Sequence, residues 1–122
     1  MHWALVFVGG GLGALARHAV GRATLHAFGP GFPWGTLTVN VAGSFLIGLA
    51  VGLFALLETG QPTRLFLVTG FLGGFTTFSA FSLDALTLWE RDPWMGALYV
   101  AASVLLSFAA IVAGVLLSRL LA

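Results

Sequence analysis

The stretch "GFLGGFTTFSAFS", residues 70 to 82, lies inside an apolar segment long enough to cross a membrane. It places Gly73 and Gly74 just before Thr76 and Thr77, near the middle of that segment. Glycine costs a helix up to about 1 kcal/mol relative to alanine, and threonine adds a smaller penalty. The stretch therefore predicts a helix that breaks between Gly73 and Thr77. A continuous helix whose glycines accept a neighbouring backbone is the alternative.

The chain around this stretch is strongly apolar. Of its 122 residues, 59% are hydrophobic and 7% are charged, and the mean hydropathy is +1.04. A soluble domain of this size could not cover its surface with so few charges. The net charge of +1 argues against nucleic acid as a partner, and the absence of cysteine excludes disulfides and thiolate metal sites. The expected partner is the lipid bilayer.

Four apolar stretches are long enough for a helix to cross the hydrocarbon core, at residues 3–25, 36–57, 64–88 and 95–121. Segments rich in proline, glycine and charge separate them at residues 29–33, 58–62 and 90–93. The sequence thus predicts an all-α membrane protein with four transmembrane helices, in a single domain over residues 1–122.

The arginines do not select one orientation in the membrane. With four spans, Arg64 and Arg119 lie on one side, whereas Arg17, Arg22 and Arg91 lie on the other. Because arginine and lysine bias normally sets topology, this near balance favours insertion in both orientations and an antiparallel, dual-topology homodimer. A single, weakly biased topology is the alternative.

Several polar residues lie at membrane depth. Arg17 would face an aqueous cavity or a partner, or would snorkel to the interface. Asn40 would either hold helices together or offer its amide donors to an anion. Tyr99, Ser103 and Ser107 are spaced by four and share one helix face, which lines a helix contact or a water-filled track.

After the expected break, Phe78 and Phe81 lie three residues apart, with Ser79 beside them. A phenyl ring has an electropositive edge but no formal charge. A pathway of ring edges, hydroxyls and an amide would suit a small anion that must be partly dehydrated and then released. An aromatic stripe that faces lipid would give the same pattern. Carbonyls freed by the break would need a cavity or a cation.

The sequence offers no site for covalent chemistry. His2, His18 and His26 are not at metal-ligand spacing. The segment "VGGGLGA" at 8–14 matches a dinucleotide-binding pattern, but it lies inside a membrane span and lacks the strand and helix context of that motif. We therefore expect a protein that is not an enzyme and has no organic cofactor.

Three motifs together resemble the CrcB/Fluc family of fluoride channels: "GGGLGALARH" at 9–18, "GTLTVNVAGSFLIG" at 35–48 and "GFLGGFTTFSAFS" at 70–82. The resemblance covers nearly the whole chain. It implies a four-span, antiparallel dual-topology homodimer in the cytoplasmic (inner) membrane. It also implies passive fluoride export through two pores along the subunit interface, with a structural sodium ion at the centre.

The resemblance also implies roles for individual residues. Phe78 and Phe81 would present ring edges to fluoride, and Asn40 would donate its amide. The backbone carbonyls of Gly73 and Thr76 would hold the sodium. The remaining positions implied are Ser79, Tyr99, Ser103 and Ser107 in the polar track, Arg17 in the aqueous vestibule, and Asp84 as an acidic position past the aromatic pair. Ala80 departs from the family, in which a threonine or serine is expected.

Two other functions fit a small four-span protein. An exporter of organic cations would need a membrane-embedded acid in the first span, where this chain has Arg17 and no acid. A purely structural subunit would use Asn40 and the serine stripe only to hold helices together.

Overall fold

The structure is a computed structural model that describes residues 1–121. All regular secondary structure over these residues is helical: α1 (His2–Phe28), α2 (Trp34–Leu57), α3 (Gln61–Arg64), a π-helical segment η1 (Leu65–Leu72), α4 (Gly73–Phe75), α5 (Phe78–Arg91) and α6 (Pro93–Leu120). Four helical stretches are long and apolar enough to cross a membrane: α1, α2, the combined segment Gln61–Arg91, and α6. The four predicted spans are confirmed, each with slightly different ends.

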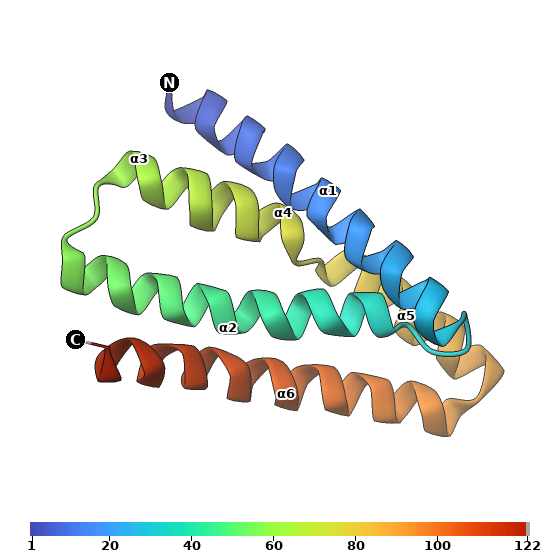
Figure 1. Ribbon diagram of the computed structural model, residues 1–122. Helices are drawn as coiled ribbons and strands as arrows, with labels where there is room; N and C mark the ends of the chain where they lie inside the picture. Colours follow the sequence, from blue (N-terminus) through green and yellow to red (C-terminus); the bar gives the residue numbers. More distant parts are fainter. Residues whose placement is uncertain (122) are drawn as a thin grey trace.

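The predicted loops also end the helices. Gly29 follows α1 with a φ of 78°, a backbone conformation that glycine adopts readily, and its N–H donates to the Leu25 carbonyl at 2.8 Å. Pro93 begins α6, and Asp92 caps that helix by accepting from the Trp94 N–H at 3.1 Å. Both chain ends and the connection from α2 to α3 lie at one end of the bundle, with the other two connections at the opposite end (Figure 1).

Glycines allow the helices to pack with their backbones close together. A methyl group on Gly9 or Gly13 of α1 would meet backbone atoms of η1. On the other side of the molecule, Gly48 of α2 lies against the Ile111 carbonyl of α6, and Gly114 of α6 lies against the Phe45 carbonyl. These contacts make two closely packed pairs, α1 with η1 and α2 with α6, which Figure 1 shows on opposite sides of the bundle. Small residues of this kind are typical of helix contacts in lipid.

The buried core is small, and many large apolar side chains are exposed on the single chain. Its centre is Val39 of α2 with Leu72 and Phe75 from the segment before the break, and partly buried side chains of α1 and α2 pack around them. The Phe71 and Phe75 rings are stacked, with centroids 6.0 Å apart. This core fixes the first half of the third span against α1 and α2.

The third span is broken, as predicted, but at a narrower place. Gly73 remains helical, with φ −62° and ψ −37°, and α4 continues to Phe75. Only Thr76 (φ −85°, ψ 156°) and Thr77 (φ −152°, ψ 120°) are extended. The expectation that the break begins at Gly73 is therefore wrong. Gly74 serves close packing, since a Cβ there would meet the Gly10 backbone of α1, whereas a Cβ on Gly73 would make only an ordinary contact with the Val68 carbonyl. The π-helical turn before the break was not expected from the sequence.

Candidate functional site

Two side chains from neighbouring helices satisfy the backbone at the break. Asn40 of α2 accepts from the Thr77 N–H through Oδ1 at 2.8 Å and donates from Nδ2 to the Thr77 carbonyl at 2.9 Å. Arg17 of α1 donates from Nε to the Gly74 carbonyl at 3.1 Å. Asn40 thus holds helices together, as one of the two sequence interpretations proposed, while its amide keeps a second N–H. Arg17 has a protein partner inside the span.

These contacts divert two donors from their usual helical partners. In a continuous α-helix the Thr77 N–H would bond the Gly73 carbonyl, and the Ala80 N–H would bond the Thr76 carbonyl. Here the first goes to Asn40 Oδ1, and the second goes to Thr77 Oγ1 at 3.1 Å, which caps α5. The carbonyls of Gly73 and Thr76 thereby lose their regular donors. These are the two oxygens that sequence resemblance assigned to a sodium ion.

A cavity of about 280 Å³ lies beside the break, between α2, α5 and α6. Its lining combines aromatic rings, an amide and hydroxyls, and none of residues 1–121 contributes a charged side chain to it. Five of the predicted pore residues meet there: Asn40, Phe78, Phe81, Ser103 and Ser107. Ser44 and Thr77 add two hydroxyl groups that the sequence did not single out.

The two predicted aromatic residues differ in their surroundings. Phe78 is 78% exposed in the single chain, whereas Phe81 is partly buried. Their ring centroids are 5.5 Å apart, and the Phe81 ring lies 5.3 Å from the ring of Tyr99. Phe81 therefore connects the exposed ring at the break with the interior of the subunit.

Tyr99 and Ser103 form a buried polar pair on α6. Tyr99 is 0% exposed and Ser103 is 5% exposed, and among residues 1–121 neither hydroxyl has a hydrogen-bond partner. The side chains of Thr36 and Asp84 lie near the Tyr99 hydroxyl. Thr36 donates to Asp84 Oδ2 at 2.6 Å. Because buried hydroxyls are usually bonded, these two leave capacity for water or an ion.

Arg17, Ser79 and Gly73 lie outside the central cavity. Arg17 borders a separate cavity that includes Arg22, Thr36 and Ala80. Ser79 is exposed, with its hydroxyl 3.3 Å from Thr77 Oγ1. Gly73 is exposed on the surface of the single chain. Ser107 lies in the central cavity one turn beyond Ser103, so only part of the predicted stripe is buried.

Besides Ser44, sequence reasoning missed the contact of Thr36 and the cap formed by Thr77. Thr36 lies in the first turn of α2, and its bond to Asp84 crosses 48 positions of the sequence, so spacing gave no signal. Thr77 was assigned only to the break, although its hydroxyl caps α5. Threonine is common at the N-cap, the residue just before a helix, where its hydroxyl accepts from the N–H three residues later. The position of Thr77 before an apolar helix could therefore have predicted this cap. No cluster of three or more metal-ligating side chains occurs within residues 1–121.

Comparison with known proteins covers almost the full chain. The family described as CrcB-like protein, Camphor Resistance (CrcB) matches residues 4–115. A protein of Rhizobium leguminosarum bv. trifolii (strain WSM2304), named Fluoride-specific ion channel FluC, is 55% identical over 120 residues, or 97% of this chain and 96% of the relative. Proteins with the same name from Agrobacterium fabrum and Sphingopyxis alaskensis are each 54% identical, over 95% and 93% of this chain and 94% and 92% of the relatives.

Identity above one half along nearly the whole length leaves no part of the four-helix chain unmatched except its ends. The motifs at 9–18, 35–48 and 70–82 all lie inside the matched range. The chain belongs to the CrcB family.

Proposed function

We propose that this protein is a fluoride-selective channel that exports fluoride passively across the cytoplasmic membrane. The observation that carries the proposal is the uncharged cavity beside the break, in a chain whose relatives are named fluoride-specific channels. Ring edges, an amide N–H and hydroxyls stabilise a small anion without holding it as tightly as a formal charge would. Conduction through such a channel involves no enzymatic step.

The pathway uses the residues that meet in and around that cavity. Phe78 and Phe81 present ring edges, Asn40 offers the N–H that Thr77 leaves free, and Ser103 and Ser107 supply hydroxyls. Tyr99 continues the track toward Asp84, and Ser79 lies at its exposed side. Arg17 attracts anions at the vestibule that it borders with Arg22.

The functional unit is an antiparallel homodimer with two pores along the subunit interface. Support comes from the surface of the single chain, where Phe78 is 78% exposed and Gly73 is exposed beside a break in the helix. Lipid does not satisfy backbone carbonyls, so the broken segment requires cover by protein or water. A second copy in the opposite orientation supplies that cover and the other wall of each pore.

A structural sodium ion fits at the centre of this dimer. The carbonyls of Gly73 and Thr76 have lost their helical donors to Asn40 and Thr77. Two copies would provide four neutral oxygens, which are hard ligands of the type that alkali cations accept. Bound there, sodium would neutralise the carbonyl dipoles and link the two subunits.

Fluoride efflux from liposomes tests the proposal. Purified protein is reconstituted in vesicles loaded with potassium fluoride or potassium chloride, and efflux is followed with the matching ion electrode after valinomycin is added. Fluoride release well above that of protein-free vesicles, with chloride at background, is expected. Absence of fluoride release, or equal release of both anions, would refute the proposal.

A further inference from the structure

Four aromatic side chains make a continuous row from the break to the surface of the subunit. Consecutive ring centroids are separated by 5.5 Å between Phe78 and Phe81, 5.3 Å between Phe81 and Tyr99, and 5.4 Å between Tyr99 and Phe32. We call these residues the aromatic row. The first two follow the break on α5, the third lies on α6, and Phe32 belongs to the loop between α1 and α2.

Phe32 occupies a defined place at the end of this row. Its ring meets the Tyr99 ring nearly perpendicularly, at an interplanar angle of 88°. This edge-to-face geometry is the favoured contact of two aromatic quadrupoles. Phe32 also borders a cavity of about 320 Å³ that contains Thr36, Asp84 and Arg91. The ring therefore lies between the buried Tyr99 and a polar space at the end of the bundle.

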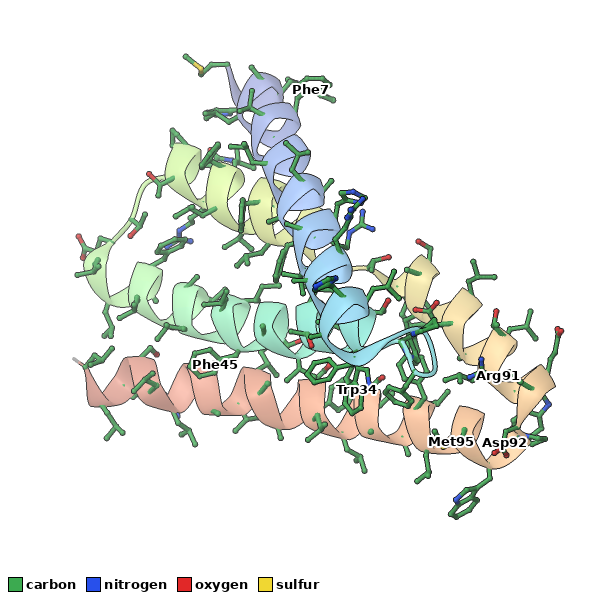
Figure 2. The ribbon with its side chains drawn as sticks, turned by 45° about the vertical axis from the view of Figure 1, so that its right-hand side comes forward. Phe7, Trp34, Phe45, Arg91, Asp92 and Met95 are labelled. Atoms are coloured by element: carbon green, nitrogen blue, oxygen red, sulfur yellow. The ribbon has the colours of Figure 1, made fainter. Side chains whose placement is uncertain are left out.

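The loop that carries Phe32 is held from two sides. The Trp34 ring packs on Phe32 with centroids 4.7 Å apart, and the Trp34 N–H donates to the Phe32 carbonyl at 2.8 Å. From the other side, Arg91 Nη2 donates to the carbonyl of Gly31 at 2.6 Å, across 60 positions of the sequence. Figure 2 shows Arg91 at the end of α5, at the same end of the molecule as Trp34.

We propose that Phe32 is the outermost ring of the anion pathway and that Arg91 is the residue that positions it. The inference rests on the proposed channel function. The Phe32 ring contacts Tyr99 and borders the polar cavity that contains Asp84, so it lines the route between the buried pair Tyr99 and Ser103 and that cavity. The edge of the Phe32 ring extends the uncharged, weakly electropositive lining of the pathway. This lining reaches the polar cavity, where the anion is rehydrated. Arg91 acts through the Gly31 carbonyl by fixing the loop.

Leucine at position 32 tests the ring itself, because it keeps an apolar side chain but removes the electropositive edge. In the liposome assay, Phe32→Leu should lower fluoride efflux about 3- to 10-fold, the range that one aromatic contact represents. The matched control is Phe28→Leu. Phe28 is 66% exposed and its one aromatic partner is Trp34, so its replacement should leave efflux unchanged.

Arg91 is tested by its dependence on Phe32. Arg91→Ala should lower efflux, and Arg91→Lys, which keeps a donor and the charge, should restore most of it. In a Phe32→Leu background, Arg91→Ala should cause little further loss, because residues that act as a unit are not additive. An equal further loss would mean that Arg91 acts by its charge, and would overturn its positioning role.

Thiol labelling gives a readout that is independent of conduction, since the chain has no cysteine of its own. Thr24 is partly buried and borders the same cavity as Phe32. A Thr24→Cys reporter in the purified protein should react faster with a charged methanethiosulfonate when Arg91 is alanine than when it is arginine. An unchanged rate would contradict the role of Arg91 in holding the loop.

The outcomes separate this inference from the channel function on which it rests. No fluoride efflux from the unmodified protein would refute both. Normal efflux from the unmodified protein together with equal efflux from Phe32→Leu would overturn the role of Phe32 alone. A loss in Phe28→Leu as large as that in Phe32→Leu would also overturn it, because the effect would then belong to the loop and not to the aromatic row.

Discussion

Asn40 binds both backbone polar groups of Thr77, accepting from its N–H at 2.8 Å and donating to its carbonyl at 2.9 Å. One side chain of α2 thus replaces the hydrogen bonds that the broken helix cannot make for itself. Asn40 also borders the cavity beside Phe81. The same amide therefore stabilises the break and lies on the pathway that we propose for fluoride.

Removal of the Asn40 amide should lower the stability of the protein and also reduce its rate of fluoride efflux. Asn40→Ala leaves two backbone groups at membrane depth without partners, at a cost of about 1–3 kcal/mol each. We expect a lower thermal midpoint in detergent, measured by circular dichroism, and reduced fluoride efflux. The control is Thr38→Ala on the exposed side of α2. Normal stability of Asn40→Ala would show that Thr77 finds other partners.

Mutation can distinguish the contribution of the Thr76 side chain from that of the backbone at the break. Thr76 Oγ1 donates to the Leu72 carbonyl at 3.0 Å, one turn back in the same span. Thr76→Ala removes only this local bond, so its effect on stability and fluoride efflux should be small. Thr77→Pro should abolish folding or activity, because it removes the N–H given to Asn40 and forces φ far from −152°. Equal, large losses from both variants would point to the threonine side chain.

Sodium removal tests the cation site directly. Replacing sodium with N-methyl-D-glucamine should lower the thermal midpoint of the unmodified protein and of Thr76→Ala by similar amounts, because both keep the carbonyl. The stabilisation by a bound ion follows its concentration, so the midpoint should rise as sodium is returned. A midpoint that does not depend on sodium would argue against the site.

The ring of Phe81 should matter more than its size. Phe81→Ile keeps an apolar side chain but loses the ring that contacts Phe78 and Tyr99 at 5.5 and 5.3 Å. Fluoride efflux should fall about 3- to 10-fold while the protein stays folded. Phe7→Ile is the matched control, because Phe7 is 83% exposed on α1 and points away from the bundle (Figure 2). Undiminished efflux in Phe81→Ile would count against an aromatic role.

The sequence predicted the four spans because length, hydropathy, proline and glycine act locally, as at Gly29 and Pro93. It also predicted a broken third span, but placed the break from helix propensity alone. Propensity does not show that Gly74 serves close packing with α1 while Asn40 draws Thr77 out of the helix. That contact spans 37 positions and depends on how α2 packs.

The candidate site also contains residues that the sequence indicated and a residue that only the structure shows. Asn40, Phe81 and Ser103 were recognised because amides, rings and hydroxyls are unusual at membrane depth. Phe32 escaped notice because an aromatic residue in a loop next to two prolines has nothing unusual in its sequence context. The Phe32 ring contacts Tyr99 only because α6 packs against the loop between α1 and α2 in the folded chain.

Glycine packing gives a prediction with a sharp internal control. Alanine at Gly48 would place a methyl group against the Ile111 backbone of α6, whereas no atom of the described residues 1–121 lies within 4 Å of a methyl group at Gly11. Gly48→Ala should be destabilised by about 1–3 kcal/mol in denaturation followed by circular dichroism. Gly11→Ala should be neutral or stabilised by up to about 1 kcal/mol, because alanine favours a helix. Similar losses in both would contradict close packing of α2 and α6.

Membrane orientation can be read by labelling single cysteines in intact cells. Thr63→Cys and Glu90→Cys lie at opposite ends of the bundle, and both positions are exposed. In a dual-topology population, an impermeant maleimide should label each variant to about half of the level reached after permeabilisation. Full labelling of one and none of the other would demonstrate a single topology and would remove the basis for an antiparallel dimer.

Removal of one arginine should then favour one membrane orientation over the other. Arg64 is exposed, and its contact with the protein is a 3.4 Å bond to the Phe54 carbonyl, so Arg64→Ala should be well tolerated. It leaves only Arg119 on one side against Arg17, Arg22 and Arg91 on the other. Since the arginine-rich side stays cytoplasmic, Thr63→Cys should become more accessible from outside and Glu90→Cys less so. Because one orientation would then predominate, fluoride efflux should fall for lack of antiparallel partners. Coexpression with an oppositely biased Gln61→Arg, Thr63→Arg chain, which keeps every native arginine, should restore it.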